Sequence, residues 1–225
     1  NKSCKNLLGR TKSMKNLTDQ QKGSLMAFVA VMFITPDSLF IRLSNVDTWG
    51  LVFYRGIIPF FTVFLGMLII YKLSFFKLLF NSGYHGLIYV GTFSLTNITF
   101  VVSIQNTNVA NTLLMIATAP MISAILGAIF LKEPPDKKTL ISIIVTFIAI
   151  IYIFFDSLKL GNFYGDILGF ITALGLAVGA VTIRSAKTKN LVPAAVVGKL
   201  FVATFALFFI ESFVLVERDL WIVPL

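Results

Sequence analysis

Ionisable and amide side chains occur inside segments of the chain that are otherwise apolar. Asp37 lies in the apolar stretch from about Ser24 to Ile41, Arg55 lies in the first third of the next one, and Asn97 lies near the middle of a third. A charge near the centre of a bilayer costs about 2.5–3.5 kcal/mol on insertion scales, so such residues have partners and often contact a transported solute. Asp37 and Arg55 are at similar depths, which predicts an ion pair that gates or couples transport, or else a purely structural ion pair or a location at the membrane interface.

Further polar residues are candidates for the same solute cavity. Lys199 lies about 7 residues, roughly 10 Å, inside the cytoplasmic edge of the last apolar segment, within snorkelling reach of the headgroups. Glu211 lies further along that segment and could carry a proton if it is buried. Asn97 can bind a solute or tie two helices together. The complete predicted set is Asp37, Arg55, Thr96, Asn97, Asn111, Thr112, Lys199 and Glu211.

The residues give little support to catalysis or metal binding. The chain has a single histidine, His85, and a single cysteine, Cys4, and it contains no HExxH motif, phosphate-binding GxxxxGK[ST] loop or intramembrane aspartate pair. We therefore expect no catalytic residue, no cofactor and no metal, and a carrier driven by gradients instead of ATP. Two alternatives remain open: a membrane-embedded enzyme acting on lipid-linked substrates, with Asp37 and Arg55 as its nearest candidate site, and a non-transporting membrane scaffold.

The elements that must position these side chains are membrane spans. Hydrophobic residues make up 57% of the chain and charged residues 13%, with a mean hydropathy of +0.89, which is typical of an integral membrane protein. The pattern predicts an all-α polytopic protein whose seven apolar segments run over about 24–41, 48–71, 86–104, 109–131, 140–155, 164–183 and 192–216.

Small residues predict how some of these helices pack. The uncharged stretch Val109 to Leu131 is 23 residues long, about 34 Å as a helix, and Pro120 within it should cause a kink. The threonine face of the third segment, formed by Thr92, Thr96, Thr99 and Ser103, should not contact lipid. The residues expected to pack closely against other helices are Ala117, Pro120, Ala124, Gly127, Gly165, Gly169, Gly175 and Gly179.

The distribution of basic residues predicts the orientation in the membrane. With the N-terminus inside the cell, the tail and the cytoplasmic loops contain 14 Lys and Arg residues and the opposite side contains 4. The net charge of +9 thus lies mostly in short segments between spans, a pattern that argues against nucleic-acid binding. We expect a multi-pass protein of the cell (cytoplasmic or inner) membrane with a cytoplasmic N-terminus.

An internal repeat becomes visible when the chain is aligned with itself at an offset of 142 residues. Gly23 then aligns with Gly165, Arg42 with Arg184, and Gly56 with Gly198. Five spans separate the two copies, so the second copy should enter the membrane from the opposite side, as in transporters with inverted repeats. The expected domains are a basic tail over 1–22, a first five-helix repeat over 23–155, and an incomplete second repeat over 164–225.

Two strings identify the family that the chain resembles. The string A-P-M-I-S-A-I-L-G-A-I-F-L-K-E, from Ala119 to Glu133, and G-D-I-L-G, from Gly165 to Gly169, look like the EamA-type permeases of the drug/metabolite transporter superfamily. The resemblance covers about Gly23 to the end of the chain. It implies two inverted five-helix repeats around a central cavity, and members export or import amino acids, sugars and other metabolites. Only seven of the expected ten helices are visible, so we interpret the chain as truncated at its C-terminus, and its substrate class is not carried over.

These observations together predict a secondary-active carrier of small organic metabolites, such as an amino acid, a sugar or a drug-like solute, working by alternating access. The expected partners are a small-molecule solute and membrane lipid, with a homodimer left open and nucleic acid excluded.

Overall fold

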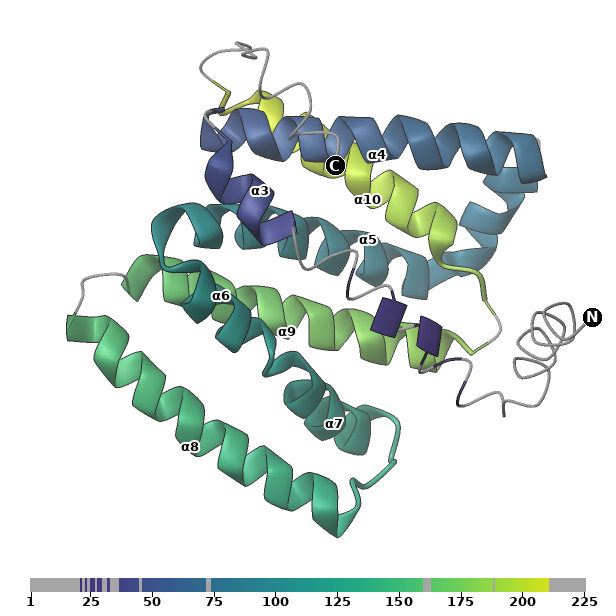
Figure 1. Cartoon of the computed structure of the whole chain (residues 1–225). Helices are drawn as coiled ribbons and strands as arrows, with labels where there is room; N and C mark the ends of the chain where they lie inside the picture. Colours follow the sequence, from purple (N-terminus) through teal and green to yellow (C-terminus); the bar gives the residue numbers. More distant parts are fainter. Residues whose placement is uncertain are drawn as a thin grey trace, which may run out of the picture. The chain divides into compact units, whose positions relative to one another are not determined.

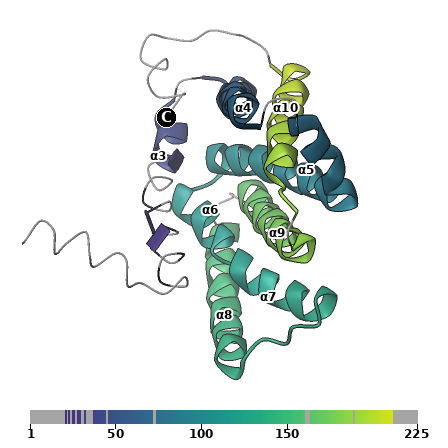
Figure 2. The same ribbon diagram turned by 90° about the vertical axis from the view of Figure 1, so that its right-hand side faces the viewer.

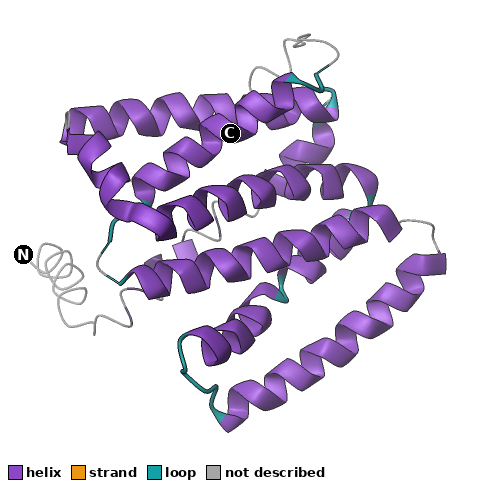
Figure 3. Cartoon of the chain, turned by 180° about the vertical axis from the view of Figure 1, so that it is seen from behind, coloured by secondary structure: helices purple, strands orange, loops and turns teal. Residues whose placement is uncertain are grey.

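The computed structural model describes residues 21, 23, 25–26, 28–29, 32, 37–44, 46–71, 74–159, 163–187 and 189–210. The chain divides into two compact units, Asn1–Leu39 and Phe40–Leu225, and the helices discussed below belong to the second unit, apart from the first residues of α3. In the described part every regular element is a helix, as Figure 3 shows. The elements of Figure 1 are α3 (Asp37–Leu43), α4 (Thr48–Tyr71), α5 (Ser74–Asn106), α6 (Val109–Ile116), α7 (Ala119–Phe130), α8 (Lys137–Lys159), α9 (Phe163–Ala186) and α10 (Val192–Leu207).

The structure confirms an all-α polytopic membrane protein. Among the described residues, four stretches are long and apolar enough to cross a bilayer, namely Thr48–Ile70, Lys77–Asn106, Val109–Leu131 and Phe163–Ala186, and Val192–Leu207 is a shorter apolar helix. The apolar segment predicted at 48–71 coincides with helix α4. Most of the segment expected at 24–41 lies outside the described residues.

Helix α5 begins earlier than the sequence suggested. The third apolar segment was predicted to begin at about residue 86, but the chain is helical from Ser74, and the side chain of Phe75 is buried beside Met67 of α4 and Val196 of α10. The two parts of α5 meet at Gly83, whose φ of 54° and ψ of −140° depart from helical values. Only glycine adopts this conformation readily, so the bend lies at that residue. The burial of Phe75 therefore outweighs the effect of the charge in this part of α5, which would favour a loop.

The uncharged stretch from Val109 to Leu131 is broken into two helices, α6 and α7. Pro120 lies in the first turn of α7 and has no N–H to donate to the Ile116 carbonyl, so the predicted kink is a full interruption at Ala117 and Thr118. The Thr118 hydroxyl is fully buried and has no hydrogen-bond partner among the described residues. Of the small residues expected to pack against another helix here, Gly127 is buried whereas Ala117 and Pro120 are exposed, so their shared packing role stays a prediction.

Two other boundaries differ from the sequence prediction. Helix α8 runs to Lys159, four residues beyond the end of the apolar segment predicted at 140–155. Helix α10 was predicted to reach Val216 but ends at Leu207. At this end, the N–H of the capping residue Phe208 bonds to carbonyls of the last turn of α10. Residues 211–225, including the candidate Glu211, lie outside the described residues.

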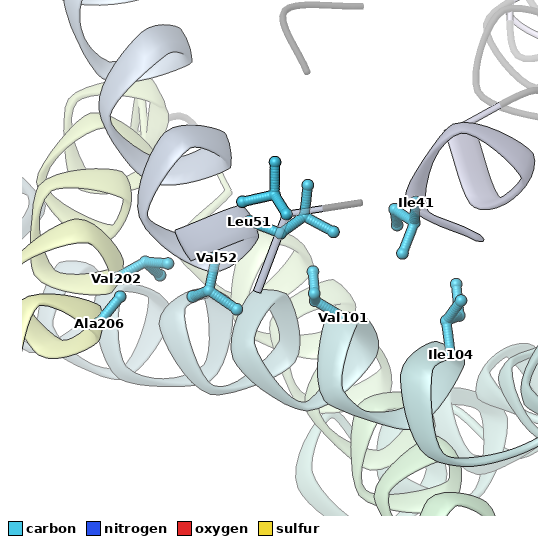
Figure 4. Packing of buried hydrophobic residues seen from close by; sticks show 8 residues of the cluster. Ile41, Leu51, Val52, Val101, Ile104, Val202 and Ala206 are labelled. Carbon is cyan, nitrogen blue, oxygen red and sulfur yellow. The ribbon is translucent and has the colours of Figure 1, made fainter. Parts of the chain in front are cut away.

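Within the second unit the helices are stacked in layers. Helices α4 and α10 lie together, followed by α5, α9, the α6–α7 pair and then α8, as Figures 1 and 2 show from two directions. An apolar cluster joins α4, α5 and α10 to the end of α3, and it includes Leu51, Val101 and Val202 (Figure 4). Since lipid is as apolar as these side chains, close van der Waals packing holds the helices together in a membrane.

Helices α4 and α10 run antiparallel and approach each other closely. Trp49 near the start of α4 stacks on Phe209 just beyond the end of α10, with ring centroids 4.7 Å apart. Met67 near the end of α4 packs with Val196 near the start of α10. Between these contacts, a Cβ added to Gly56 would lie 2.8 Å from the backbone nitrogen of Ala203. A glycine therefore allows the two backbones to pack this closely.

Glycines of α9 face hydroxyl groups of α5. A Cβ added to Gly165 would lie 2.6 Å from the Cβ of Thr107, and one added to Gly175 would collide with the Thr96 hydroxyl. Gly169 lies beside the Ser103 hydroxyl, and Gly179 lies beside Tyr89. The threonine face of α5 is thus directed towards α9, which confirms that it avoids lipid.

Candidate functional site

Three polar residues from three apolar helices meet between α4, α5 and α10. The Lys199 ammonium of α10 donates to the Asn97 side-chain oxygen of α5 at 2.6 Å and to the main-chain carbonyl of Arg55 of α4 at 3.5 Å. The same ammonium lies 5.5 Å from the centroid of the Phe93 ring. We call Arg55, Phe93, Asn97 and Lys199 the polar cluster. It gathers a cation, an amide and an aromatic face at one point of the bundle.

The local backbone explains why Lys199 reaches Asn97. Gly198 precedes Lys199, and a Cβ added there would lie 2.9 Å from Cδ1 of Phe93, so the α10 backbone passes very close to α5. Ser94 strengthens this contact, since its hydroxyl donates to the Gly198 carbonyl at 3.1 Å. The Asn97 amide nitrogen donates to the Phe93 carbonyl at 2.7 Å, which directs the amide oxygen towards the ammonium.

The polar cluster lies well inside the layer of apolar helices. A Cβ added to Gly56 would lie 3.0 Å from the Lys199 carbonyl, and Gly56 is 8 residues beyond the first residue of the 24-residue α4. At 1.5 Å per residue this is about 12 Å along a helix of about 36 Å. Arg55, Asn97 and Lys199 are all half-buried. Charged and amide groups at this depth are expensive and mark solute or ion pathways in membrane proteins.

The structure brings some of the predicted site residues together and separates others. Arg55, Asn97 and Lys199 form the polar cluster, whereas Thr96, one residue from Asn97, donates to the Thr92 carbonyl at 2.7 Å on the α9 side of α5. Thr112 of α6 is fully buried, with its hydroxyl 2.9 Å from that of Ser103. These two threonines therefore lie in a helix–helix contact, and their use by a solute stays a prediction.

Three other predicted residues are placed differently. Asn111 is half-buried on α6. Asp37 is the first residue of α3 and belongs to the unit Asn1–Leu39, whereas Arg55 belongs to the other unit, so the predicted ion pair between them stays a prediction. Glu211 lies outside the described residues.

Sequence reasoning missed a buried carboxylate. Asp166, in the first turn of α9, is fully buried, and the Thr107 hydroxyl donates to its Oδ1 at 2.6 Å. Nearby, the Ser103 hydroxyl donates to the Gly165 carbonyl at 2.7 Å. An acid four residues into an apolar helix was the available signal, but an acid near a helix N-terminus is also favoured by the helix dipole.

The two arginines matched by the internal alignment both contact the end of a helix. Arg42 donates to the carbonyls of Ile104 and Gln105, at 2.8 and 3.3 Å, in the last turn of α5. Arg184 forms an ion pair with Glu133, just beyond α7, and both side chains are about half exposed, at 54% and 57%. Cations are favoured near helix C-termini because of the helix dipole. We assign both residues to packing of helix ends.

The described residues were also compared with the ligand sets that hold metal ions. No group of three or more His, Cys, Asp or Glu side chains that could hold a metal ion occurs in that part of the chain. The polar cluster offers hydrogen-bond donors, an acceptor and positive charge.

One comparison with known proteins gives a result. The model of the EamA-like transporter family matches residues 21–155, well over half of the chain. No curated protein and no solved structure matches the chain.

Proposed function

Since the chain belongs to the EamA-like transporter family, within the drug/metabolite transporter superfamily, we propose that it carries small organic metabolites across a membrane. The observation that supports this most directly is the polar cluster, where Lys199 and Asn97 join 2.6 Å apart inside an apolar bundle. Two of the candidate spans, α4 and α5, and the shorter apolar helix α10 meet at this cluster, and the described residues offer no cluster of metal ligands. A solute with polar groups finds donors and acceptors there that lipid lacks.

The helix directions support transport by alternating access. The 142-residue offset aligns α4, which contributes Arg55, with α10, which contributes Lys199. These two helices run antiparallel, and antiparallel equivalents are expected of an inverted repeat. We assign 23–155 to the first repeat and 164–225 to part of the second, following a basic tail over 1–22. A solute bound in the polar cluster contacts both repeats, so relative rocking of the repeats would expose it to each side in turn.

The expected location is the cell membrane, with the N-terminus in the cytoplasm. This proposal rests on the 14 basic residues predicted on one side against 4 on the other. The absence of a phosphate-binding GxxxxGK[ST] loop from the sequence favours energy from a solute or ion gradient.

Flux measurements in proteoliposomes test the proposal. The purified protein is reconstituted, and entry of radiolabelled amino acids, sugars and organic acids is compared with entry into empty vesicles. We expect saturable entry of at least one solute class and a loss of about 10-fold or more in Asn97→Ala, since a buried polar contact to the solute is worth roughly 1.4 kcal/mol or more.

A matched control separates site effects from folding effects. Asn106 makes the same bond as Asn97, donating its amide to the carbonyl four residues earlier at 2.7 Å, but it is exposed at the end of α5. Asn106→Ala should therefore retain wild-type flux. Absence of saturable entry for every solute class, with correctly folded protein in the vesicles, would rule out the carrier function.

A further inference from the structure

We infer that the bend of α5 is a binding site for an anionic phospholipid, whose phosphate is held by Lys77, Lys187 and Lys189. This inference goes beyond the proposed function and requires only that the protein lies in a membrane. Its evidence is the direction of the first part of α5, the exposed side chains on this part, and the basic connection that packs against it.

The first part of α5 lies across the direction of the membrane spans. The helix bends at Gly83, and Figures 1 and 2 show the residues before the bend passing from the end of α4 to the rest of α5, transverse to α4. From Ser74 to Gly83 this part is only about 14 Å long, which is too short to cross a bilayer. A short transverse helix at the end of the spans lies in the interface between headgroups and acyl chains.

The two faces of this short helix differ in character. Phe75 and Ser82 are two turns apart on one face, and both are buried in the protein. Lys77 and Phe80 are one turn apart on the opposite face, and both are exposed. The outward face thus combines a cation for the headgroup region with an aromatic ring for the acyl chains.

The connection between α9 and α10 brings two more cations to the bend. The Ser82 hydroxyl donates to the Asn190 carbonyl at 3.2 Å, and the Lys189 ammonium would lie 3.9 Å from a Cβ added to Gly83. Lys187 and Lys189 are both exposed. Lys187 has a φ of 52°, in the left-handed region that glycine adopts more readily than lysine. A lysine at this position therefore adds a charge to the turn despite a steric cost.

The charge of these side chains favours an anion. Lys77 lies six residues before Gly83, about 9 Å along the helix, so three ammonium groups flank one bend. Glu133, beside the end of α9, is paired with Arg184. Basic side chains clustered where helices meet a membrane surface attract the phosphate of anionic lipids.

The exposed aromatic side chains favour a lipid over a free phosphate ion. Phe80 is 81% exposed, and Tyr84, one residue after the bend, is 73% exposed. Aromatic residues, tyrosine above all, are common at the membrane interface, where the ring lies beside acyl chains and the hydroxyl lies among headgroups. Free phosphate would contact only the lysines, whereas a phospholipid also covers these rings.

Thermal unfolding of the purified full chain in a neutral detergent tests the assignment. Unfolding is recorded with phosphatidylglycerol, with phosphatidylcholine of the same acyl chains, and with inorganic phosphate at equal ionic strength. We expect phosphatidylglycerol to raise Tm in a saturable way and the other two to leave it unchanged. Equal stabilisation by phosphatidylcholine, or none by phosphatidylglycerol, would overturn the assignment. Stabilisation by inorganic phosphate alone would exclude a lipid as the ligand.

Matched triple variants locate the site. Changing the three lysines at the bend to Gln should weaken phosphatidylglycerol binding by about 10-fold or more, and changing them to Arg should retain binding because the charges remain. The control changes Lys132, Lys137 and Lys138 to Gln. These residues are exposed at the same end of the bundle, as the contact between Glu133 and Arg184 shows, so binding should be unchanged. Equal loss in both Gln triples would assign the effect to general surface charge and contradict the inference.

A fluorescence measurement tests the interfacial position without relying on charge. Phe80→Trp is reconstituted in phosphatidylglycerol vesicles, with the wild-type chain as the background for its own 2 tryptophans. The added fluorescence should be quenched more strongly by lipids brominated near the glycerol than by lipids brominated at the chain ends. Equal quenching, stronger quenching at the chain ends, or none would show that the short helix is not interfacial. Any of these results would overturn the lipid site and leave the carrier function to be judged by flux.

Discussion

Helix α5 has two polar faces that differ in chemistry. On one face, the hydroxyls of Thr96, Thr99 and Ser103 are buried against glycines and hydroxyls of α9 and α6. On the other face, half-buried Asn97 meets the ammonium of Lys199. Short hydroxyl side chains can donate their hydrogen bonds to nearby carbonyls of their own helix, so they allow helices to pack closely. A long cationic side chain needs more space and an anionic or polar partner. The comparison teaches that polarity inside an apolar bundle serves helix packing on one face and offers binding chemistry on the other.

The largest expected effect is on the packing face. Gly165→Val should destabilise the protein by about 1–3 kcal/mol or more, because its Cβ would lie 2.6 Å from the Thr107 Cβ and 2.8 Å from backbone atoms that cannot move away easily. Thermal unfolding in detergent measures the change. Gly66→Val is the matched control, since nothing lies within 4 Å of a Cβ at Gly66. Equal loss in both variants would mean that the contact between α9 and α5 is not the cause.

A second change adds a charge to the binding face. In Asn97→Asp, a carboxylate replaces the amide whose oxygen lies 2.6 Å from the Lys199 ammonium, so an internal ion pair should form. We expect unchanged or raised Tm together with a flux reduced by about 10-fold or more, since displacing the new partner costs roughly 1.4 kcal/mol or more. Parallel Tm and flux measurements show whether stability and transport move in opposite directions. A parallel loss of both would assign Asn97 to packing.

A third change tests one hydroxyl pair of the packing face. The hydroxyls of Thr99 and Thr172 lie 2.8 Å apart between α5 and α9. Thr99→Val, Thr172→Val and the double variant form a thermodynamic cycle, and the coupling energy should be about 0.6 kcal/mol, as for interhelical hydrogen bonds in membranes. Flux per folded molecule should not change. A loss of flux without a loss of stability would indicate that this hydroxyl pair contacts the solute and does not serve only helix packing.

The smallest effect is expected at the surface. Glu133 pairs with Arg184, and both side chains are about half exposed, at 57% and 54%. Because solvent screens such pairs, Glu133→Gln should cost only about 0.2 kcal/mol, the lower end for exposed pairs, and less at high salt. Unfolding at low and high ionic strength measures this. A large loss that is insensitive to salt would indicate that Glu133 positions the end of α7 in some other way.

The sequence predicted features that depend on composition and periodicity. The length of the apolar segment predicted the bounds of α4, and the spacing of Thr92, Thr96, Thr99 and Ser103 predicted a face turned away from lipid. Helix ends were less predictable, because the helical start of α5 depends on Phe75 meeting Met67 and Val196, which are distant in the sequence.

The sequence predicted which residues belong to the candidate site, but it did not predict which of them lie together. Intramembrane position identified Arg55, Asn97 and Lys199, yet their meeting depends on the close approach of α10 to α5 at Gly198, which no local pattern encodes. Thr96 was grouped with Asn97 because they are adjacent, although adjacent residues on a helix are directed about 100° apart. Asp166 was overlooked because an acid in a first turn is ordinary in helices.

The interruption between α6 and α7 has a mechanical consequence. A buried hydroxyl without a partner among the described residues, that of Thr118, raises the free energy of the folded state by about 1–3 kcal/mol. Bending at that joint can relieve this penalty, and Pro120 has no N–H, so the helical bond to the Ile116 carbonyl is already missing there. The span formed by α6 and α7 should therefore bend easily at this joint, while each helix stays rigid. We expect the fastest amide hydrogen exchange of α6 and α7 at Ala117 and Thr118. Uniform protection across the joint would show that it is stiff.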